Sequence, residues 1–202
     1  MTLAPDLDAP APRDKLLTAP AIPRPVAWIT TCNPDGPVNA APFSFFNVFG
    51  PGPALIVARL GHRAGAGPQD TMANIRRTGE FVANLATGEP RGDMVATASA
   101  YPASMSGAAA LGLETAPSRR VAAPLAIERR RLVGLDFSRE RELSVGAAVA
   151  PALRDGSVDP DRMRVDRAGN MPVAGFLADR YARIVEPDPC RIPPTPDQGD
   201  TT

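Results

Sequence analysis

Proline is concentrated at both ends of this chain, and that distribution restricts an ordered core to the part in between. Residues 4–25 and 187–196 are especially rich in it. Proline has no backbone donor and a fixed φ, so such segments resist helices and central strands alike. We therefore expect a proline-rich arm over residues 1–21, one domain over residues 22–186 and a proline-rich tail over residues 187–202.

The first part of the core has the residue types of β-strands. Residues 26–32 are rich in β-branched and aromatic side chains, and residues 38–49 form another apolar run. Between them the sequence Asn-Pro-Asp-Gly-Pro at 33–37 is strong turn chemistry, so the two runs predict an antiparallel hairpin. Residues 54–60 follow a Pro-Gly-Pro break and suit a third, buried strand.

Residues 70–79 predict a short helix. Asp70 or Thr71 can cap its amino end, and Gly79 supplies a left-handed stop. Met72 and Ile75 are three residues apart, so both can face the core.

The remaining segments are short. Residues 80–86 predict a fourth strand, and the alanine-rich stretch 93–110 predicts two helical pieces separated at Tyr101-Pro102. Further strands are expected within 125–135, 143–149 and 180–185. Short strands with small inserted helices and no βαβ alternation predict a mainly β fold, an antiparallel barrel that is closed or nearly so.

The composition excludes several classes of partner. Lysine plus arginine equals aspartate plus glutamate at 22 each, so no global field would attract nucleic acid or an anionic membrane. No apolar run is long enough to span a bilayer, and the amino-terminal residues do not resemble a secretory signal, so a cytoplasmic protein is expected. Cys32 and Cys190 have no Cys or His neighbour at metal-ligand spacing, and no metal site is predicted.

No self-sufficient catalytic apparatus is visible. The lone histidine, His62, lies in a glycine-rich loop without a nucleophile beside it, and no catalytic residue is predicted. That loop, residues 61–67, is flanked by Arg59 and Arg63 and precedes the free amides expected near Asp70 and Thr71. These features suit a phosphate, whereas composition alone favours an ordinary solvated loop.

Three motifs change that balance. They are Arg-Pro-Val-Ala-Trp-Ile-Thr-Thr at 24–31, Asp-Gly-x-x-Asn-x-Ala-Pro-Phe-Ser-Phe-Phe-Asn at 35–47 and Asp-Thr-x-x-Asn-Ile at 70–75. In this order and spacing they resemble the flavin reductase-like family of FMN-binding split barrels. The resemblance covers roughly residues 22–130, and it implies an antiparallel split β-barrel of the FMN-binding type.

The resemblance also implies a site. In that family the flavin lies in a groove at a homodimer interface, held by the strand that begins with Arg-Pro, by the Ala-Pro-Phe-Ser-Phe-Phe-Asn strand and by the loop before the short helix. The cofactor-binding residues implied here are Thr30, Thr31, Pro42, Ser44, Phe45, Phe46, Asn47, Arg59, His62, Arg63, Asp70 and Thr71. Alternate strand residues face opposite sides, so at least one of Phe43, Phe45 and Phe46 is expected to be simple core or interface.

Two departures from the family pattern concern the site. Gln69 stands where a lysine commonly precedes the Asp-Thr pair and contacts the flavin phosphate, so Arg59, His62 or Arg63 would have to supply the charge. After residue 130 the resemblance is loose, and Arg167 and Tyr181 are only candidates there.

The function implied first is an FMN-dependent oxidoreductase of the NAD(P)H:flavin reductase type, in which hydride passes to the flavin N5 while the protein binds and shields the cofactor. Reduced flavin would then be reoxidised in place or pass to a partner monooxygenase. One alternative is a non-catalytic FMN-binding or electron-carrier protein. Another is a chain that has lost FMN and is a structural dimer or a binder of another planar ligand.

Overall fold

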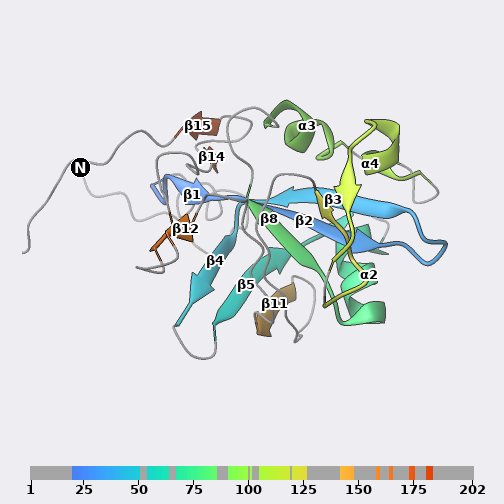
Figure 1. Ribbon diagram of the computed structural model, residues 1–202, viewed down its shortest axis with the longest axis horizontal. Coiled ribbons are helices and arrows are strands. Elements are labelled where there is room, and N and C mark those ends of the chain that lie inside the picture. The colour runs from blue at the N-terminus through green and yellow to red at the C-terminus, as the bar shows by residue number, and fades with distance from the viewer. Residues whose placement is uncertain are drawn as a thin grey trace, which may run out of the picture.

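The computed structural model describes residues 20–50, 54–63, 67–85, 91–99, 101, 105–118, 120–126, 142–147, 158–159, 164–165, 173–175 and 181–183 (Figure 1). The predicted arm and tail lie almost wholly outside these residues, so the division into arm, domain and tail stays a prediction. Within the described residues the fold is mainly β with short helices, as expected.

The first sheet has the order β3-β2-β8, from β2 (Ala27–Cys32), β3 (Val38–Phe43) and β8 (Val82–Leu85). Strands β2 and β3 pair antiparallel from Ala27 opposite Phe43 to Cys32 opposite Val38, which confirms the predicted hairpin over residues 27–43. The turn closes through the amide of Asn33, which donates to the carbonyl of Pro37 at 2.9 Å.

The second sheet has the order β11-β5-β4, from β4 (Phe46–Phe49), β5 (Leu55–Leu60) and β11 (Glu142–Ala147). A single strand over residues 38–49 is therefore wrong: the chain leaves the first sheet after Phe43 and enters the second at Phe46. Residues three apart on one strand face opposite sides. The break at Ser44 and Phe45 changes the direction of the chain, so that Phe43 and Phe46 are both buried in one core.

The first sheet is buried on both faces. Ala27 and Ile29 belong to the larger core, which also contains Met72 and Ile75 of α2 (Asp70–Thr78). The alternate residue Trp28 belongs to a smaller core with Met94 of α3 (Arg91–Ala96) and Ala108 of α4 (Gly107–Ala110). In Figure 1, α3 and α4 accordingly lie on one side of this sheet and α2 on the other.

The structure confirms the predicted helices, but the predicted N-cap of α2 is wrong. Helix α2 ends at Gly79, whose φ of 69° is left-handed, as predicted. Its N-cap, however, is Gln69 and not Asp70 or Thr71, because the chain is still extended at Gln69 and both later residues are already helical. The two helical pieces predicted within 93–110 correspond to α3 and α4.

The other strands are short. A third sheet has the order β1-β14-β15, from Arg24–Pro25, Val173–Gly175 and Tyr181–Arg183. Three two-stranded pairs join β6 (His62–Arg63) to β7 (Gly67–Pro68), β9 (Thr115–Ala116) to β10 (Leu125–Ala126), and β12 (Val158–Asp159) to β13 (Arg164–Val165). The pairings among these residues do not establish closure into a barrel, which stays a prediction. In the described part of the chain, no helix has the length and apolar character needed to cross a membrane.

Candidate ligand pocket

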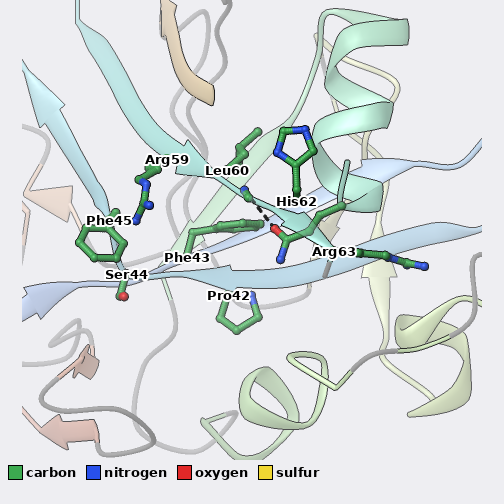
Figure 2. Close-up of a pocket in the computed structure, with 10 residues that line it drawn as sticks. Pro42, Phe43, Ser44, Phe45, Arg59, Leu60, His62 and Arg63 are labelled. Atoms are coloured by element: carbon green, nitrogen blue, oxygen red, sulfur yellow. Dashed lines mark hydrogen bonds between the residues drawn. The ribbon is translucent and has the colours of Figure 1, made fainter. Parts of the chain in front are cut away.

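A pocket of about 540 Å³ opens where the chain passes between the first two sheets. Its wall comes from the end of β3 and the break after it, from the end of β5, from β6, and from the residue before α2 (Figure 2). The lining residues are Pro42, Phe43, Ser44, Phe45, Arg59, Leu60, Gly61, His62, Arg63 and Gln69.

Gly61 and Gln69 join the two ends of the loop that forms one wall. The amide of Gly61 donates to Oε1 of Gln69 at 3.2 Å, and the amide of Gln69 donates to the carbonyl of Gly61 at 3.1 Å. A Cβ at Gly61 would lie 3.3 Å from that same Oε1, so the close approach favours glycine. The carboxamide of Gln69 thus closes the loop, with its oxygen engaged by the protein itself. Gln69 is also the N-cap position of α2, but its side chain makes no capping hydrogen bond.

Arg63 contributes a cation at the amino end of α2. Its guanidinium donates to the carboxylate of Asp70, the first residue of the helix, and to the carbonyl oxygen of Tyr101 at 3.3 Å. Both members of the ion pair keep about a third of their side-chain surface exposed. An anion in the pocket would therefore compete with Asp70 for this guanidinium.

Arg59 contributes a second cation, at the other end of the pocket. Its guanidinium carbon lies 5.0 Å from the centroid of the Phe45 ring, and that of Arg24 lies 5.7 Å from the same centroid. The backbone supports this arrangement, because the amide of Arg59 donates to the carbonyl of Phe45 at 2.9 Å. In Figure 2, Arg59 lies beside Phe45 and Arg63 points out at the opposite end.

Half of the predicted cofactor-binding residues come together at this pocket. The predicted residues that line it are Pro42, Ser44, Phe45, Arg59, His62 and Arg63. Asp70 does not line the pocket, but it accepts a hydrogen bond from Arg63, which does.

Thr30, Thr31 and Thr71 do not line the pocket; they are buried and have partners within the protein. Thr30 donates its hydroxyl to the carbonyl of Pro124 at 2.6 Å. Asn39 donates its amide to the hydroxyl of Thr31 at 3.2 Å and to that of Thr71 at 2.8 Å. Asn74 donates its amide to Thr31 as well, at 3.0 Å. These bonds tie α2 to the β2–β3 hairpin, and a direct contact of the three threonines with a cofactor stays a prediction.

The last two predicted residues lie on β4. Phe46 is core, as expected of at least one of the phenylalanines. Asn47 is exposed, and its side-chain oxygen accepts from the amide of Val48 at 2.8 Å. Neither lines the pocket.

Some residues at the site were not predicted to bind. Phe43 lines the pocket without having been assigned to it, and Arg24 reaches Phe45 from β1. Leu60, Gly61 and Gln69 belong to the loop before the helix, residues 59–71, which was predicted as a whole, but they were not singled out as binding residues. The sequence does point to Gly61 and Gln69, because Gly61 begins the glycine-rich loop and Gln69 directly precedes the Asp-Thr pair. Arg167 lies outside the described residues, and Tyr181 packs against the smaller core.

Cys32, at the end of β2, lies outside the pocket lining. Burial raises the pKa of its thiol, the Arg77 guanidinium lowers that pKa, and the Glu80 carboxylate raises it further. The net direction is upward, so the thiol is less acidic than a free cysteine and correspondingly a poorer nucleophile at neutral pH.

Comparison with known proteins gives consistent results. Residues 19–146 match the model of the flavin reductase like domain. An uncharacterized protein of Deinococcus radiodurans is 36% identical over 179 residues, covering 83% of this chain and 78% of that protein. The crystal structure of nitrilotriacetate monooxygenase component B from Bacillus cereus superposes with a TM-score of 0.83 at 25% identity, covering 94% of this chain and 98% of that one. The 2-nitrobenzoate 2-nitroreductase NbaA of Pseudomonas fluorescens gives 0.82 at 27% identity, covering 98% and 100%.

Proposed function

Because the chain belongs to the flavin reductase-like domain family, we propose that it is an FMN-dependent oxidoreductase of the NAD(P)H:flavin reductase type. One observation carries this proposal. The pocket lies at the break within the Ala-Pro-Phe-Ser-Phe-Phe-Asn segment and has a guanidinium at each end of an otherwise largely uncharged wall. Such a wall suits a long ligand that combines a planar ring system with a phosphate.

The residues present fit FMN in size and character. The volume of about 540 Å³ lies within the range of roughly 300–1,000 Å³ that is usual for small-molecule sites. Phe43, Leu60 and Pro42 supply apolar surface for a ring, while the Ser44 hydroxyl can donate or accept a hydrogen bond. For the phosphate we favour the end at Arg63, because the first-turn amides of α2, which have no acceptor within the helix, and a guanidinium occur together there.

A bound flavin would supply hydride acceptance, which explains why this chain needs no catalytic triad. The protein's own contribution is to bind and orient. Arg63 would exchange Asp70 for the phosphate, and the loop closed by Gly61 and Gln69 would hold that wall in place.

The partners follow from the same proposal. Component B of a monooxygenase is among the similar structures, which supports a role in supplying reduced flavin to a second protein. We include a cytoplasmic homodimer in the proposal, with the flavin between two chains. Light scattering would then give twice the chain mass of 21.2 kDa. A mass of one chain at every concentration would remove the dimer from the proposal.

Two spectra test the function. The purified protein, mixed with FMN and freed of excess, should absorb in the visible range where no side chain does. Anaerobic NADH or NADPH should then bleach that absorption within the time of steady-state turnover. Colour that persists with both nucleotides would favour an electron-carrier or binding protein. Absence of bound flavin at every FMN concentration would contradict both functions.

A further inference from the structure

The Nη2 nitrogen of Arg63 has two acceptors that come from different parts of the chain. It donates to the carboxylate of Asp70 on α2 and, at 3.3 Å, to the main-chain carbonyl of Tyr101. A guanidinium has five N–H donors, two of them on Nη2, so these two bonds use both hydrogens of that nitrogen. Within the described residues the Nε and Nη1 atoms make no hydrogen bond. Their donors are therefore available to a ligand in the pocket, which Arg63 lines.

The two acceptors should respond differently to a bound phosphate. Asp70 carries a negative charge, so a phosphate at the amino end of α2 would compete with it for the guanidinium. The carbonyl of Tyr101 is neutral, so a phosphate does not have to displace it. This carbonyl is the contact that would keep the guanidinium in place after Asp70 has released it.

The packing of the Tyr101 side chain fixes the position of this carbonyl. The Tyr101 ring lies directly against Gly107, the first residue of α4, where a Cβ would be 2.9 Å from Cδ2 and 3.0 Å from Cε2 of the ring. A glycine permits this close approach, because any other residue would place a Cβ against the ring. The amide of Tyr101 also donates to the carbonyl of Ser99 at 2.9 Å. The ring and the amide together hold the main chain at Tyr101.

The helix that supports this ring is itself attached to the first sheet. Ser106 donates its hydroxyl to the carbonyl of Val38 on β3, and it caps α4 by accepting from the amide of Ala109 at 3.1 Å. Ala108 is buried in the smaller core. A continuous series of contacts thus runs from β3 through α4 and Tyr101 to the guanidinium of Arg63.

We infer that Tyr101 is a positioning residue for the phosphate end of the pocket: its ring, packed on Gly107, sets the main-chain carbonyl that holds Arg63. This inference rests on the proposed function, because the phosphate concerned is that of FMN. Tyr101 does not line the pocket and acts through Arg63, which does. The preference of the protein for FMN over riboflavin, which lacks the phosphate, therefore depends on the contact between α4 and Tyr101.

The test compares wild type with Tyr101→Ala, which removes the ring, and Tyr101→Phe, which keeps it. Gly107→Ala displaces the ring, and Gly92→Ala on α3 is its matched control, because a Cβ there meets no atom within 4 Å. Quenching of flavin fluorescence gives the Kd of FMN and of riboflavin. Tyr101→Ala and Gly107→Ala should each raise the Kd of FMN about fivefold, as expected for one hydrogen bond, and change that of riboflavin less than about twofold. Tyr101→Phe and Gly92→Ala should bind both flavins as wild type does.

A double variant shows whether Tyr101 acts through Arg63. Once Arg63→Ala has removed the guanidinium, the carbonyl has nothing to hold, so adding Tyr101→Ala should raise the Kd of FMN by less than about twofold. The full loss in that background overturns the inference, because independent effects multiply. It is also overturned if Tyr101→Ala leaves FMN affinity unchanged, or if FMN and riboflavin affinities fall in parallel, as general damage to the fold would cause.

Nitrogen-15 NMR of the flavin-free protein separates this inference from the proposed function. The side-chain signals of Arg63 are assigned by their absence in Arg63→Ala. Rotation of the guanidinium about its Cζ–Nε bond should be slower in wild type and Tyr101→Phe than in Tyr101→Ala, where the carbonyl has lost its support. If flavin is bound and reduced but neither this rotation nor the FMN preference depends on Tyr101, the inference is wrong and the reductase stands. If the rotation depends on Tyr101 but no flavin binds, the positioning of Arg63 stands, and its assignment to the FMN phosphate is wrong together with the proposed function.

Discussion

Replacing Asp70 with asparagine should tighten FMN binding while it weakens the fold. The carboxylate holds the Arg63 guanidinium, and it would lie near the phosphate if the phosphate binds at the amino end of α2. Asparagine keeps the shape of the side chain and removes its charge. The guanidinium then becomes available to the phosphate, and a like-charge repulsion disappears.

The magnitude follows from exposure. The side chains of Arg63 and Asp70 are 31% and 28% exposed, so their interaction is screened and has the value of a surface pair. One unit charge acting at about 4 Å in water contributes roughly 1 kcal/mol. We therefore expect the Kd of FMN to fall about fivefold in Asp70→Asn, since about 1.4 kcal/mol corresponds to a factor of ten.

Stability should move in the opposite direction. An acidic residue in the first turn of a helix stabilises it by typically 0.3–1 kcal/mol, and Asp70→Asn loses that contribution as well as the ion pair. A protein that was simply damaged would bind FMN more weakly, not more tightly. Urea unfolding of the flavin-free protein measures the loss of stability, and quenching of flavin fluorescence measures the affinity for FMN.

The companion variant Arg63→Ala should raise the Kd of FMN about tenfold or more, roughly 1.4 kcal/mol, because it removes the phosphate ligand and leaves Asp70 uncompensated. Riboflavin, which has no phosphate, should bind both variants about as it binds wild type. The reasoning is refuted if Asp70→Asn leaves FMN affinity unchanged while Arg59→Ala lowers it, or if riboflavin and FMN shift in parallel.

The remaining predictions concern the scaffold. Gly107→Ala should destabilise the fold by about 1–3 kcal/mol, because the new Cβ would lie 2.9 Å from the Tyr101 ring; Gly92→Ala on α3, which meets open space, is the control, and equal midpoints in thermal unfolding would contradict the clash. Asn39→Ala should cost roughly 1–3 kcal/mol, since it leaves the buried Thr71 hydroxyl without its amide donor and removes one of the two amide donors to Thr31; a loss under a few tenths of a kcal/mol in urea unfolding would count against the network. The pKa of the Cys32 thiol is raised on folding. The contribution of Cys32 to the free energy of unfolding is therefore fully present below the unfolded pKa and is lost as pH rises through the folded pKa. Alkylation of Cys32 at pH 8, followed by peptide mapping, should be slower than alkylation of glutathione.

The local elements were readable from the sequence because their signals are local. The turn residues at 33–37 fix the β2–β3 register, and Gly79 ends α2 as its left-handed conformation requires. The break at Ser44 and Phe45 was not readable, because it lies inside an apolar run without glycine, and the proline of that run, Pro42, lies within β3 and not at the break. Only the requirement to bury Phe43 and Phe46 in one core reveals it.

The site was readable in part for a similar reason. Ser44 lies within one of the motifs, and Arg59 lies near the end of a strand that precedes the glycine-rich loop, so both could be assigned to the site from the sequence. The roles of Thr31 and Thr71 depend on Asn39, which reaches them across a strand pair and a helix. Hydroxyl groups suit a cofactor and a buried network equally well, so residue type alone cannot separate the two. The sequence shows that Gln69 lacks the charge of the family's usual lysine, but only the coordinates show that it occupies the N-cap position and closes the loop.

The pocket lies where the chain crosses from one sheet to the other. A ligand bound at this position stabilises the folded state, so the supply of ligand affects the amount of folded protein. A molecule bound there contacts residues that follow β3, others that end β5 and the residue that begins α2, so it holds together parts that separate when the chain unfolds. A ligand at a hundred times its Kd stabilises the folded state by about 2.7 kcal/mol. Since a change of 1–2 kcal/mol can alter cellular abundance several-fold, cells short of flavin should accumulate less of this protein even when its synthesis is unchanged.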